Sequence, residues 1–479
     1  MRSRGALASL LCARAAGVRW STLGVVDDGR TDNTAALNAL PVGALVEGDC
    51  PRGGVVLAQG VWNLRSNLFL RVDAGCAVLS NNTGVGSYAI SQLDPTAPLN
   101  NVTLEGLAVS KTSRVPGDRI LLAWIDNFRL SNWTFRNHGG AMFLRGSCQE
   151  IAGGRSFDAA LEVGSPGVRH IGNLPKAACL RPLPANVWVH DNDIVCGDGV
   201  YQACQPLNNN LWANVGSDDM LFENNTGASL ASAFILVGLH NKPQNSDFSC
   251  TNVTFRNSRG AGLRLIYVQA GPPPNVVEGV VLRGLELTSS DAGPYWPAAI
   301  EVAAVYGGAV RAVLMDGIRA LGIPKRGLNA TGVLENVVFT NGYLATPTDG
   351  VVSNVNIDGG DAVELSNSFV GGFNADNVNI GVSAATRGTR VLNCTLAGVS
   401  ANRVGIAIGR ADGSAIIANK FTVQPGAANT TGIVTDVGAY AGTTRAAIHL
   451  NDVRALATGI VCGHGEGNNI TGNPGARDC

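Results

Sequence analysis

The sequence predicts an all-β chain in which short parallel strands wind into a solenoid. Segments of the form Asn-x-apolar-x-apolar recur along the chain at spacings of roughly 20–30 residues, which is typical of stacked structural repeats. Within these segments apolar and polar residues alternate with a period of two, and no helical period accompanies them. The 479 residues include 61 glycines and only 15% charged residues, a composition that favours strands joined by tight turns.

The repeated segments extend through most of the chain, so we expect one elongated domain over residues 18–479. They include NVTLEGLAV from Asn101, NVWVHDNDI from Asn186, NVTFRNS from Asn252, ENVVFTNGY from Glu335 and SNVNIDGG from Ser353. A parallel coil leaves unpaired backbone groups only at its two ends, which therefore need caps. We expect residues 18–80 to form the N-terminal cap and first rungs, and residues 450–479 to form the C-terminal cap.

Residues 1–17 have the pattern of a secretory signal peptide. Two arginines precede an apolar run over residues 5–13, and Ala13-Arg14-Ala15 supplies a small-residue cleavage site. A basic tail is the alternative. Removal of this segment would take away Cys12 and leave 11 − 1 = 10 cysteines, an even number compatible with disulfides. The chain is therefore expected to be secreted or displayed on a surface.

Asn-x-Thr sequences are frequent, and they make glycosylation a hypothesis for a secreted chain. Many belong to the repeat itself, where Asn suits turns and Thr suits strands. They begin at Asn81, Asn101, Asn132, Asn224, Asn252, Asn329, Asn393, Asn429 and Asn469.

The segment after the leader combines a turn, a helix start and a strand. Asp28-Gly29 indicates a turn, and Thr31 or Asp32 can cap a short helix over residues 32–40. Residues 53–64 then alternate like a strand, with a turn at Gly60.

This segment resembles the N-terminal part of the pectin-lyase-like superfamily, which includes polygalacturonases and phage tailspikes. The resemblance is carried by Asp28-Gly29-Arg30-Thr31-Asp32-Asn33-Thr34, followed by the Gly53–Gly54 strand and Trp62. It implies a right-handed parallel β-helix whose open end is capped by the short helix. It also implies a carbohydrate-active function.

The polygalacturonases of this superfamily use three aspartates, a histidine and an Arg-x-Lys, and the resemblance carries over only in part. Ser232 and Ala233 stand where the paired aspartates are expected, and Ile266 replaces the lysine. The family's catalytic set is therefore absent or rearranged. The residues with matching linear spacing are kept as secondary candidates; they are Asp218, Asp219 and His240.

An alignment of the rung-opening segments gives the principal candidates. Apolar residues such as Leu265 and Ile300 face inward in this alignment, which covers residues 139–145, 157–163, 197–203, 232–238, 261–267 and 298–304. A set of charged and polar residues then faces outward on one sheet. It consists of Arg145, Asp158, Glu162, Asp198, Gln202, Arg264 and Glu301.

Two of these carboxylates suggest acid–base chemistry. Neighbouring parallel strands lie about 4.8 Å apart, so Asp158 and Asp198 would lie about 5 Å apart, near the separation in retaining glycosidases. We expect Asp158, Asp198 and Glu162 to be catalytic. Arg145 and Arg264 are expected to bind uronate carboxylates. Further substrate contacts are expected from Gln202, Tyr267 and Trp212, whereas the structural alternative is a solvated outer face with ordinary ion pairs.

The favoured function is an extracellular glycoside hydrolase that resembles polygalacturonases and acts on an acidic polysaccharide. A non-catalytic glycan-binding protein, used for adhesion or on a virion surface, is the first alternative. A polysaccharide lyase or uronan epimerase is the second. The net charge of −1 does not favour a nucleic-acid partner, and no apolar run has the length of a membrane span.

No cofactor is expected for a hydrolase, whereas a lyase would need a cation such as Ca²⁺. Asp191, Asp193 and Asp198 offer oxygen ligands, although the sequence HDND is also typical of a turn. No Cys/His spacing resembles a zinc site. The oligomeric state and the polysaccharide are left open by the sequence.

Overall fold

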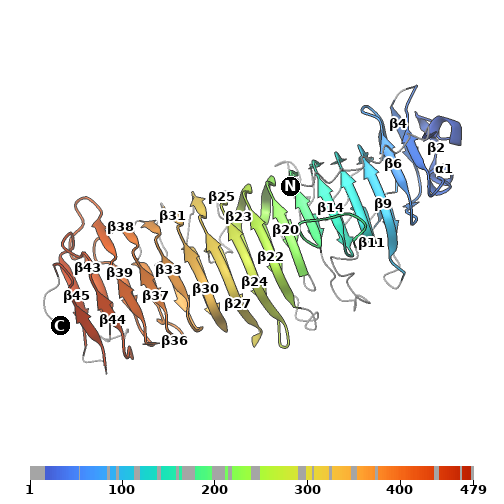
Figure 1. The fold of residues 1–479 in the computed structure, drawn as a ribbon. Coiled ribbons are helices and arrows are strands. Elements are labelled where there is room, and N and C mark those ends of the chain that lie inside the picture. The colour runs from blue at the N-terminus through green and yellow to red at the C-terminus, as the bar shows by residue number, and fades with distance from the viewer. Residues whose placement is uncertain are drawn as a thin grey trace, which may run out of the picture.

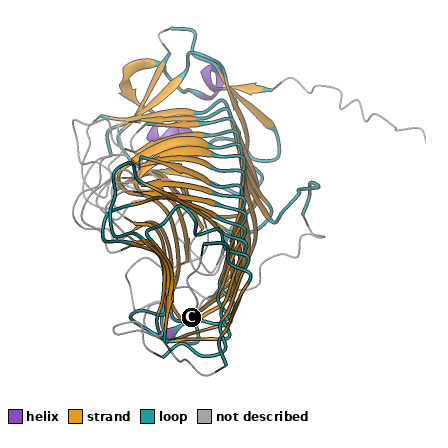
Figure 2. Ribbon diagram, turned by 90° about the vertical axis from the view of Figure 1, so that its left-hand side faces the viewer, coloured by secondary structure: helices purple, strands orange, loops and turns teal. Residues whose placement is uncertain are grey.

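The computed structural model shows an elongated right-handed coil of parallel strands, which confirms the predicted fold class (Figures 1 and 2). The strands stack from the N-terminal end to the C-terminal end in chain order, each rung covering the next. The structure describes residues 17–52, 54–82, 87–92, 97–112, 119–136, 142–157, 161–163, 179–196, 211–213, 218–238, 249–289, 298–304, 307–322, 326–346, 353–372, 376–435, 442–463 and 467–475.

Each full rung contributes one strand segment to each of three parallel sheets, here called A, B and C, in that order along the chain. The long strands β11 (Arg119–Ser131), β21 (Thr226–Gly238) and β23 (Arg259–Ala270) bend at a corner and serve two sheets. Sheet A contains part of β11 together with β1 (Val18–Arg19), β3 (Leu45–Gly48), β6 (Phe69–Val72), β9 (Leu99–Glu105), β14 (Gln149–Ala152), β17 (Val187–His190), β20 (Asp218–Glu223), β22 (Cys250–Arg256), β24 (Val276–Arg283), β27 (Ala309–Asp316), β30 (Leu334–Thr340), β33 (Glu364–Ser366), β37 (Arg390–Leu392), β41 (Ala415–Ile417), β44 (Ala447–His449) and β46 (Asn469–Thr471).

Sheets B and C complete each rung. Sheet B contains the first parts of β21 and β23 with β2 (Asp28–Asp32), β4 (Val55–Ala58), β7 (Ala77–Ser80), β10 (Ala108–Lys111), β12 (Thr134–Arg136), β15 (Arg155–Ser156), β18 (Asp193–Cys196), β25 (Glu286–Ser289), β28 (Arg319–Leu321), β31 (Tyr343–Thr346), β34 (Phe369–Gly372), β38 (Thr395–Val399) and β42 (Lys420–Val423). Sheet C contains the remaining parts of β11, β21 and β23 with β5 (Trp62–Asn63), β8 (Tyr88–Gln92), β13 (Met142–Arg145), β16 (Leu161–Val163), β19 (Leu211–Ala213), β26 (Ala298–Ala304), β29 (Arg326–Gly332), β32 (Ser353–Asp358), β35 (Asp376–Ile380), β39 (Val404–Ile408), β43 (Thr431–Thr435) and β45 (Thr458–Cys462). A separate pair, β36 (Thr386–Arg387) and β40 (Ala411–Asp412), lies at a corner.

The core is built from columns of like side chains that stack along the coil. In sheet C one such column is Ile235, Ile266, Ile300, Leu328, Val355 and Val378. All of its members are at most 2% exposed. In sheet A the rings of Phe222 and Phe255 stack with centroids 4.2 Å apart. Truncation of such a side chain to alanine typically costs about 2–5 kcal/mol, so these columns supply most of the stability.

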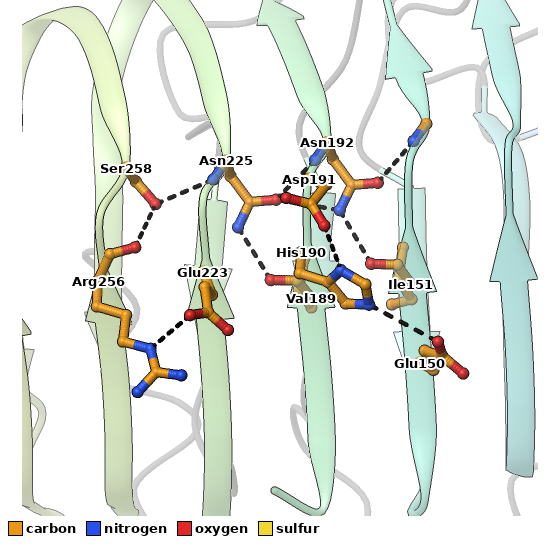
Figure 3. A network of polar contacts seen from close by, with 11 residues as sticks. Glu150, Ile151, Val189, His190, Asp191, Asn192, Glu223, Asn225, Arg256 and Ser258 are labelled. Carbon is orange, nitrogen blue, oxygen red and sulfur yellow. Dashed lines mark hydrogen bonds and ion pairs between the residues drawn. The ribbon is translucent and has the colours of Figure 1, made fainter. Parts of the chain in front are cut away.

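Buried amides form a second column at the corner between sheets A and B. The Asn192 amide donates to the Ile151 carbonyl at 3.0 Å, and its backbone N–H donates to Asn225 Oδ1 at 3.1 Å. The Asn225 amide donates in turn to the Val189 carbonyl at 3.0 Å, and its backbone N–H donates to Ser258 Oγ at 3.2 Å (Figure 3). The side chains therefore satisfy backbone groups that the turn leaves without strand partners.

The N-terminal end is capped much as predicted. The helix α1 (Thr34–Asn38) is shorter than the predicted range, and the 3₁₀ turn η1 (Trp20–Leu23) buries Trp20 beside it. Asp32 accepts the backbone N–H of Thr34 at 3.0 Å, at the start of the helix. No helix among the described residues is long and apolar enough to cross a membrane.

The cysteines are partly paired. Disulfides join Cys50 to Cys76 in the N-terminal region and Cys148 to Cys179 beside sheet A, and Cys462 is also disulfide-bonded. Cys250 and Cys394 are buried free thiols, so the even cysteine number does not mean that all of them pair. Burial raises the pKa of the Cys394 thiol to about 11, which keeps it protonated and unreactive.

The asparagines of the sequons mostly serve the turns. Six of them adopt a left-handed backbone with φ near 50–60°, a conformation that asparagine tolerates better than most residues; they are Asn101, Asn132, Asn224, Asn252, Asn393 and Asn429. Asn329 lies inside β29 and is only 7% exposed, so that sequon is not accessible for glycosylation in the folded chain.

Replacement of Asn225 by leucine should destabilise the chain strongly. The change leaves the Val189 carbonyl and the Asn192 N–H without their partners, and each orphaned buried group costs about 1–3 kcal/mol. Asn225→Ser is the matched control, because Ser258 occupies the equivalent position one rung on and retains an acceptor. Urea denaturation followed by circular dichroism should rank the parent above N225S and N225S above N225L; equal midpoints would contradict a role for the amide column.

Acid should weaken the N-terminal region through Asp28. The backbone N–H groups of Thr31 and Arg30 and the Thr31 hydroxyl donate to this carboxylate, which lowers its pKa from 3.8 to about 2. A lowered folded-state pKa gives stability that is present above pH 3.8 and is lost as the pH falls toward about 2. Calorimetry of Asp28→Asn should show a lower melting temperature than the parent at pH 6 and a smaller difference near pH 2. A difference that does not change with pH would rule out this linkage.

Candidate functional site

One outward-facing column of sheet C brings together several of the residues singled out by sequence. The strand register aligns Glu162 with Trp212, Trp212 with Leu236, Leu236 with Tyr267 and Tyr267 with Glu301. The same line continues through Asn329, Asn356 and Asn379 on the following rungs. These positions alternate with the inward isoleucine column, so they lie on the outer side of the sheet. We call this line the sheet C column.

The observed register differs from the sequence alignment at the rung that follows β16. The strand that follows β16 in sheet C is β19, so Trp212 rather than Gln202 is aligned with Glu162. Residues 211–213 therefore hold the sheet C position that the sequence alignment had given to residues 197–203. The segment Leu-Trp-Ala is too short to show period-two alternation, and the asparagines beside it resemble a turn. The segment GDGVYQA, in contrast, has the pattern of a strand.

A second difference arises at a β-bulge between β21 and β23. The register shifts between Ser229 and Ala233, which aligns Arg264 with Ala233. Separately, the regular pairing of β23 with β26 aligns Glu301 with Tyr267, whereas the sequence alignment had placed Glu301 beside Arg264. A bulge of this kind changes the pairing between strands without changing the local sequence pattern, so the sequence alone does not indicate it.

Several predicted residues fall outside the described part of the chain. Asp158, Asp198, Gln202 and His240 are among the residues that are not described, and the side chains of Glu162, Trp212 and Arg264 are likewise not described. Asp158 follows the end of β15 by two residues, and Asp198 follows the end of β18 by two residues. The two strands that precede them, β15 and β18, pair directly. Their catalytic role stays a prediction.

Arg145 and Tyr267 lie on sheet C but are not on an open surface. Arg145 is 2% exposed, and its guanidinium donates to the Leu144 carbonyl at 3.2 Å. Tyr267 is 4% exposed and belongs to a small apolar cluster with Ala233, Leu236 and Ala303, separate from the main core. The expectation of an outward, solvent-facing side chain is wrong for Arg145 and also for Glu301, which is 8% exposed, whereas the substrate contact expected of Tyr267 stays a prediction.

Asp218 and Asp219 are structural. Asp219 accepts the backbone N–H of Asn186 at 2.9 Å, and Asp218 accepts the Thr251 hydroxyl at 2.6 Å. Each carboxylate thus links two adjacent rungs at the edge of sheet A, away from sheet C. This agrees with the sequence argument that placed them off the main column.

A polar cluster that the sequence analysis did not identify continues the column. Arg326 donates to Asn329 Oδ1 at 3.0 Å and to the Ser353 carbonyl at 3.3 Å. Asn356 donates to both Asn329 Oδ1, at 3.0 Å, and Asp358 Oδ2, at 2.9 Å. Burial lowers the pKa of the Arg326 guanidinium, and the nearby carboxylates of Asp358 and Glu301 partly counteract this effect. We call this group the Arg326 cluster.

The signal for the Arg326 cluster was present in the sequence. In SNVNID, polar residues occupy every second position of a strand, and the structure shows Asn354, Asn356 and Asp358 at most 7% exposed. A solvated outer face would leave such side chains open. The amides and the Asp358 carboxylate are instead held in a fixed order by hydrogen bonds to one another.

Two further acceptors on this side of the coil have no hydrogen-bond partner. They are Gln269 Oε1 and Asn379 Oδ1, both buried. Asn379 lies on the sheet C column itself, and Gln269 lies two residues beyond Tyr267 on β23. Buried acceptors without partners are uncommon in folded proteins and often mark a place where a ligand or water binds.

The described residues hold no group of three His, Cys, Asp or Glu side chains that could bind a metal ion. Of the residues considered for Ca²⁺, Asp191 contacts His190 Nδ1 at 2.7 Å (Figure 3). Asp193 accepts the Thr226 hydroxyl at 3.0 Å and lies 3.8 Å from Arg155. Both aspartates thus have partners within the fold.

No protein-family model and no curated protein sequence matches the chain. Solved structures with a similar fold include a tailspike protein mutant of E. coli bacteriophage HK620 in complex with a pentasaccharide. It is 10% identical, with a TM-score of 0.58 over 90% of this chain and 80% of that one. A second mutant of that tailspike gives a TM-score of 0.56 at 11% identity, over 93% of this chain and 78% of that one.

A surface adhesin of Streptococcus pneumoniae, PfbA, is 11% identical over 76% of this chain and 91% of its own, with a TM-score of 0.45. At these identities the comparisons establish the fold alone. The chain has the parallel β-helix fold that is also found in the tailspike structures.

Proposed function

We propose that the chain is a secreted or surface-displayed protein that binds an acidic polysaccharide along sheet C and hydrolyses its glycosidic bonds. The observation that carries this proposal is the sheet C column, in which aromatic, carboxylate and amide residues share one register line over successive rungs. A linear polymer parallel to the coil axis would meet equivalent positions at intervals of about 4.8 Å. Disulfides in the described part support an oxidising compartment.

The fold gives independent support for a carbohydrate ligand. The HK620 tailspike mutant, which has the same fold, was solved in complex with a pentasaccharide. In this chain the Arg326 cluster supplies a half-buried guanidinium between two carboxylates, together with two amides. A guanidinium of this kind binds a uronate carboxylate with two parallel hydrogen bonds.

Hydrolysis is assigned to Asp158 and Asp198, with Glu162 as the next carboxylate on sheet C. Both aspartates follow strands that pair directly, with Ser156 aligned with Ile194, so we place them on neighbouring rungs with an offset of up to two residues, a separation of about 5–8 Å. Two carboxylates this close favour one protonated and one ionised group, which supplies a general acid and a base or nucleophile. The ionised partner would attack or activate water at the anomeric carbon, while the acid protonates the leaving oxygen.

Binding without cleavage is the second candidate function. It is favoured by the Arg326 cluster, in which Asn356 and Asp358 are already held by hydrogen bonds within the protein. Asp358 accepts the backbone N–H of Ser383 at 2.9 Å, so this carboxylate is committed to the fold. Such a preorganised surface suits recognition.

Asp158→Asn and Asp198→Asn should each lower hydrolysis of an acidic polysaccharide about 100-fold or more, because each removes an acid–base group. The assay follows reducing ends and ultraviolet absorbance over a panel of uronic-acid polysaccharides. Reducing ends without absorbance identify a hydrolase, and both signals together identify a lyase. Glu335→Gln is the control, since this exposed sheet A carboxylate pairs only with Arg311 in the structure. Unchanged activity in D158N and D198N would refute the catalytic assignment.

Arg326→Lys should weaken binding of the same polysaccharide about tenfold, because lysine keeps the charge but cannot form two parallel hydrogen bonds. Affinity is measured by isothermal titration calorimetry, with the melting temperature recorded to verify folding. The matched control is Arg311→Lys, on the outer face of sheet A. Equal affinity of R326K and the parent would remove the Arg326 cluster from the binding surface.

A further inference from the structure

A second surface, on sheet B, has the properties of a binding groove. A depression of about 530 Å³ lies over four successive rungs, β21, β23, β25 and β28, and is lined by Thr226, Arg259, Ala261, Glu286, Thr288 and Arg319 among others. Every lining residue belongs to the described part of the chain. We call it the sheet B groove.

The register explains the shape of the groove. One outward row of sheet B carries the large residues Thr226, Arg259, Glu286 and Arg319, each aligned with the next. The neighbouring outward row, two residues further along each strand, carries the small residues Ala228, Ala261 and Thr288 and ends at Leu321 on the rung of Arg319. The charged row therefore forms a wall, and the small row forms a floor parallel to the coil axis. With strands about 4.8 Å apart, the floor is long enough for a short linear oligomer.

The wall has an uncompensated positive charge at one end. Arg259 pairs with Glu286 at 2.9 Å, and both side chains are more than half exposed. Arg319, on the next rung, has no carboxylate within 4.0 Å among the described residues. Its guanidinium lies instead over the ring of Tyr343, 5.5 Å from the centroid. Stacking on a ring fixes the plane of a guanidinium and leaves its N–H groups free to bind an anion.

Two aromatic residues continue the outward row beyond Arg319. Tyr343 and Phe369 are aligned with Arg319 in the same row, and their rings stack with centroids 4.7 Å apart and an interplanar angle of 8°. Tyr343 thus lies between the Arg319 guanidinium and the ring of Phe369, and the stacked rings support the guanidinium. The functional group of the groove is thus the oriented Arg319.

Sheet A shows what a purely structural charged face looks like in this fold. There the arginines of successive rungs pair with carboxylates of a neighbouring rung, as in Arg256 with Glu223 at 2.8 Å and Arg283 with Asp316 at 3.0 Å. Such a ladder neutralises itself. The sheet B row differs because its charge alternation ends at Arg319, next to a hollow surface.

We propose that the sheet B groove is a second glycan site, separate from sheet C, which binds an anionic group of a linear acidic polysaccharide through Arg319. The chain lies along the floor of small residues, with the anion at Arg319 and with Arg259 and Glu286 contacting the neighbouring sugar. Two sites on different faces of one rigid coil increase the retention of a long polysaccharide without requiring tighter contacts at either site. This proposal does not depend on hydrolysis at sheet C.

The test is binding of polygalacturonate, chondroitin sulfate and neutral dextran to the full chain, measured by calorimetry at two salt concentrations. Arg319→Ala should lower the affinity for the anionic chain about tenfold, and Arg319→Lys should give an intermediate loss. Glu286→Gln should increase affinity, because it removes a negative charge from the wall and releases Arg259. Arg283→Ala is the matched control, an equally exposed sheet A arginine whose loss should have no effect.

Loss of binding in R319A with either polygalacturonate or chondroitin sulfate supports the proposal and identifies a carboxylate or a sulfate as the anion. Equal losses in R319A and R283A would overturn it, because they would indicate attraction by bulk charge. Equal binding of dextran, or a change of oligomeric state in R319A seen by light scattering, would also overturn it. These binding measurements test the sheet B groove even if the chain hydrolyses no polysaccharide. The proposal of hydrolysis can therefore fail while the proposal of a second glycan site stands.

Discussion

In-register parallel pairing is the constraint on which the rest of this structure depends. Each residue lies directly above its counterpart on the next rung, so a choice of side chain at one position is repeated as a column along the coil. Apolar columns pack continuously inside, and the amides of Asn192 and Asn225 link consecutive corners. A side chain that does not match its column therefore disturbs the packing of both neighbouring rungs.

The same constraint produces three outer faces with different chemistry. On sheet A, arginines and carboxylates alternate and neutralise one another; exposed pairs of this kind contribute only about 0–1 kcal/mol each. On sheet B, the alternation ends at Arg319 beside a floor of small residues. On sheet C, carboxylate, guanidinium and amide groups are buried and bonded to one another. Stability comes from the inner columns, which leaves the outer ones available for recognition.

Two departures from regular pairing affect sheet C, and further register shifts lie on sheet B, between β2 and β4 and between β38 and β42. The bulge between β21 and β23 changes the partner of Arg264, and the short strand β19 inserts Trp212 into the column. The disulfide between Cys148 and Cys179 and the hydrogen bond from Leu180 to Asn127 fix the chain where it returns to sheet A before β17. A regular scaffold can tolerate such local irregularities because the neighbouring rungs still hold their register.

The sequence by itself determined the fold class, the helical cap and the inward columns, because period-two alternation, turn asparagines and Asp32 act locally. It also indicated correctly that Asp218 and Asp219 lie off the main column. Only the tertiary structure decided which outward residues are neighbours. Pairing between rungs is set by bulges and by short strands such as Leu211–Ala213, which leave no periodic trace. For that reason the pairing of Glu301 with Tyr267, the contacts within the Arg326 cluster and the groove at Arg319 follow only from the stacked rungs, although the alternating polar residues of SNVNID are visible in the sequence.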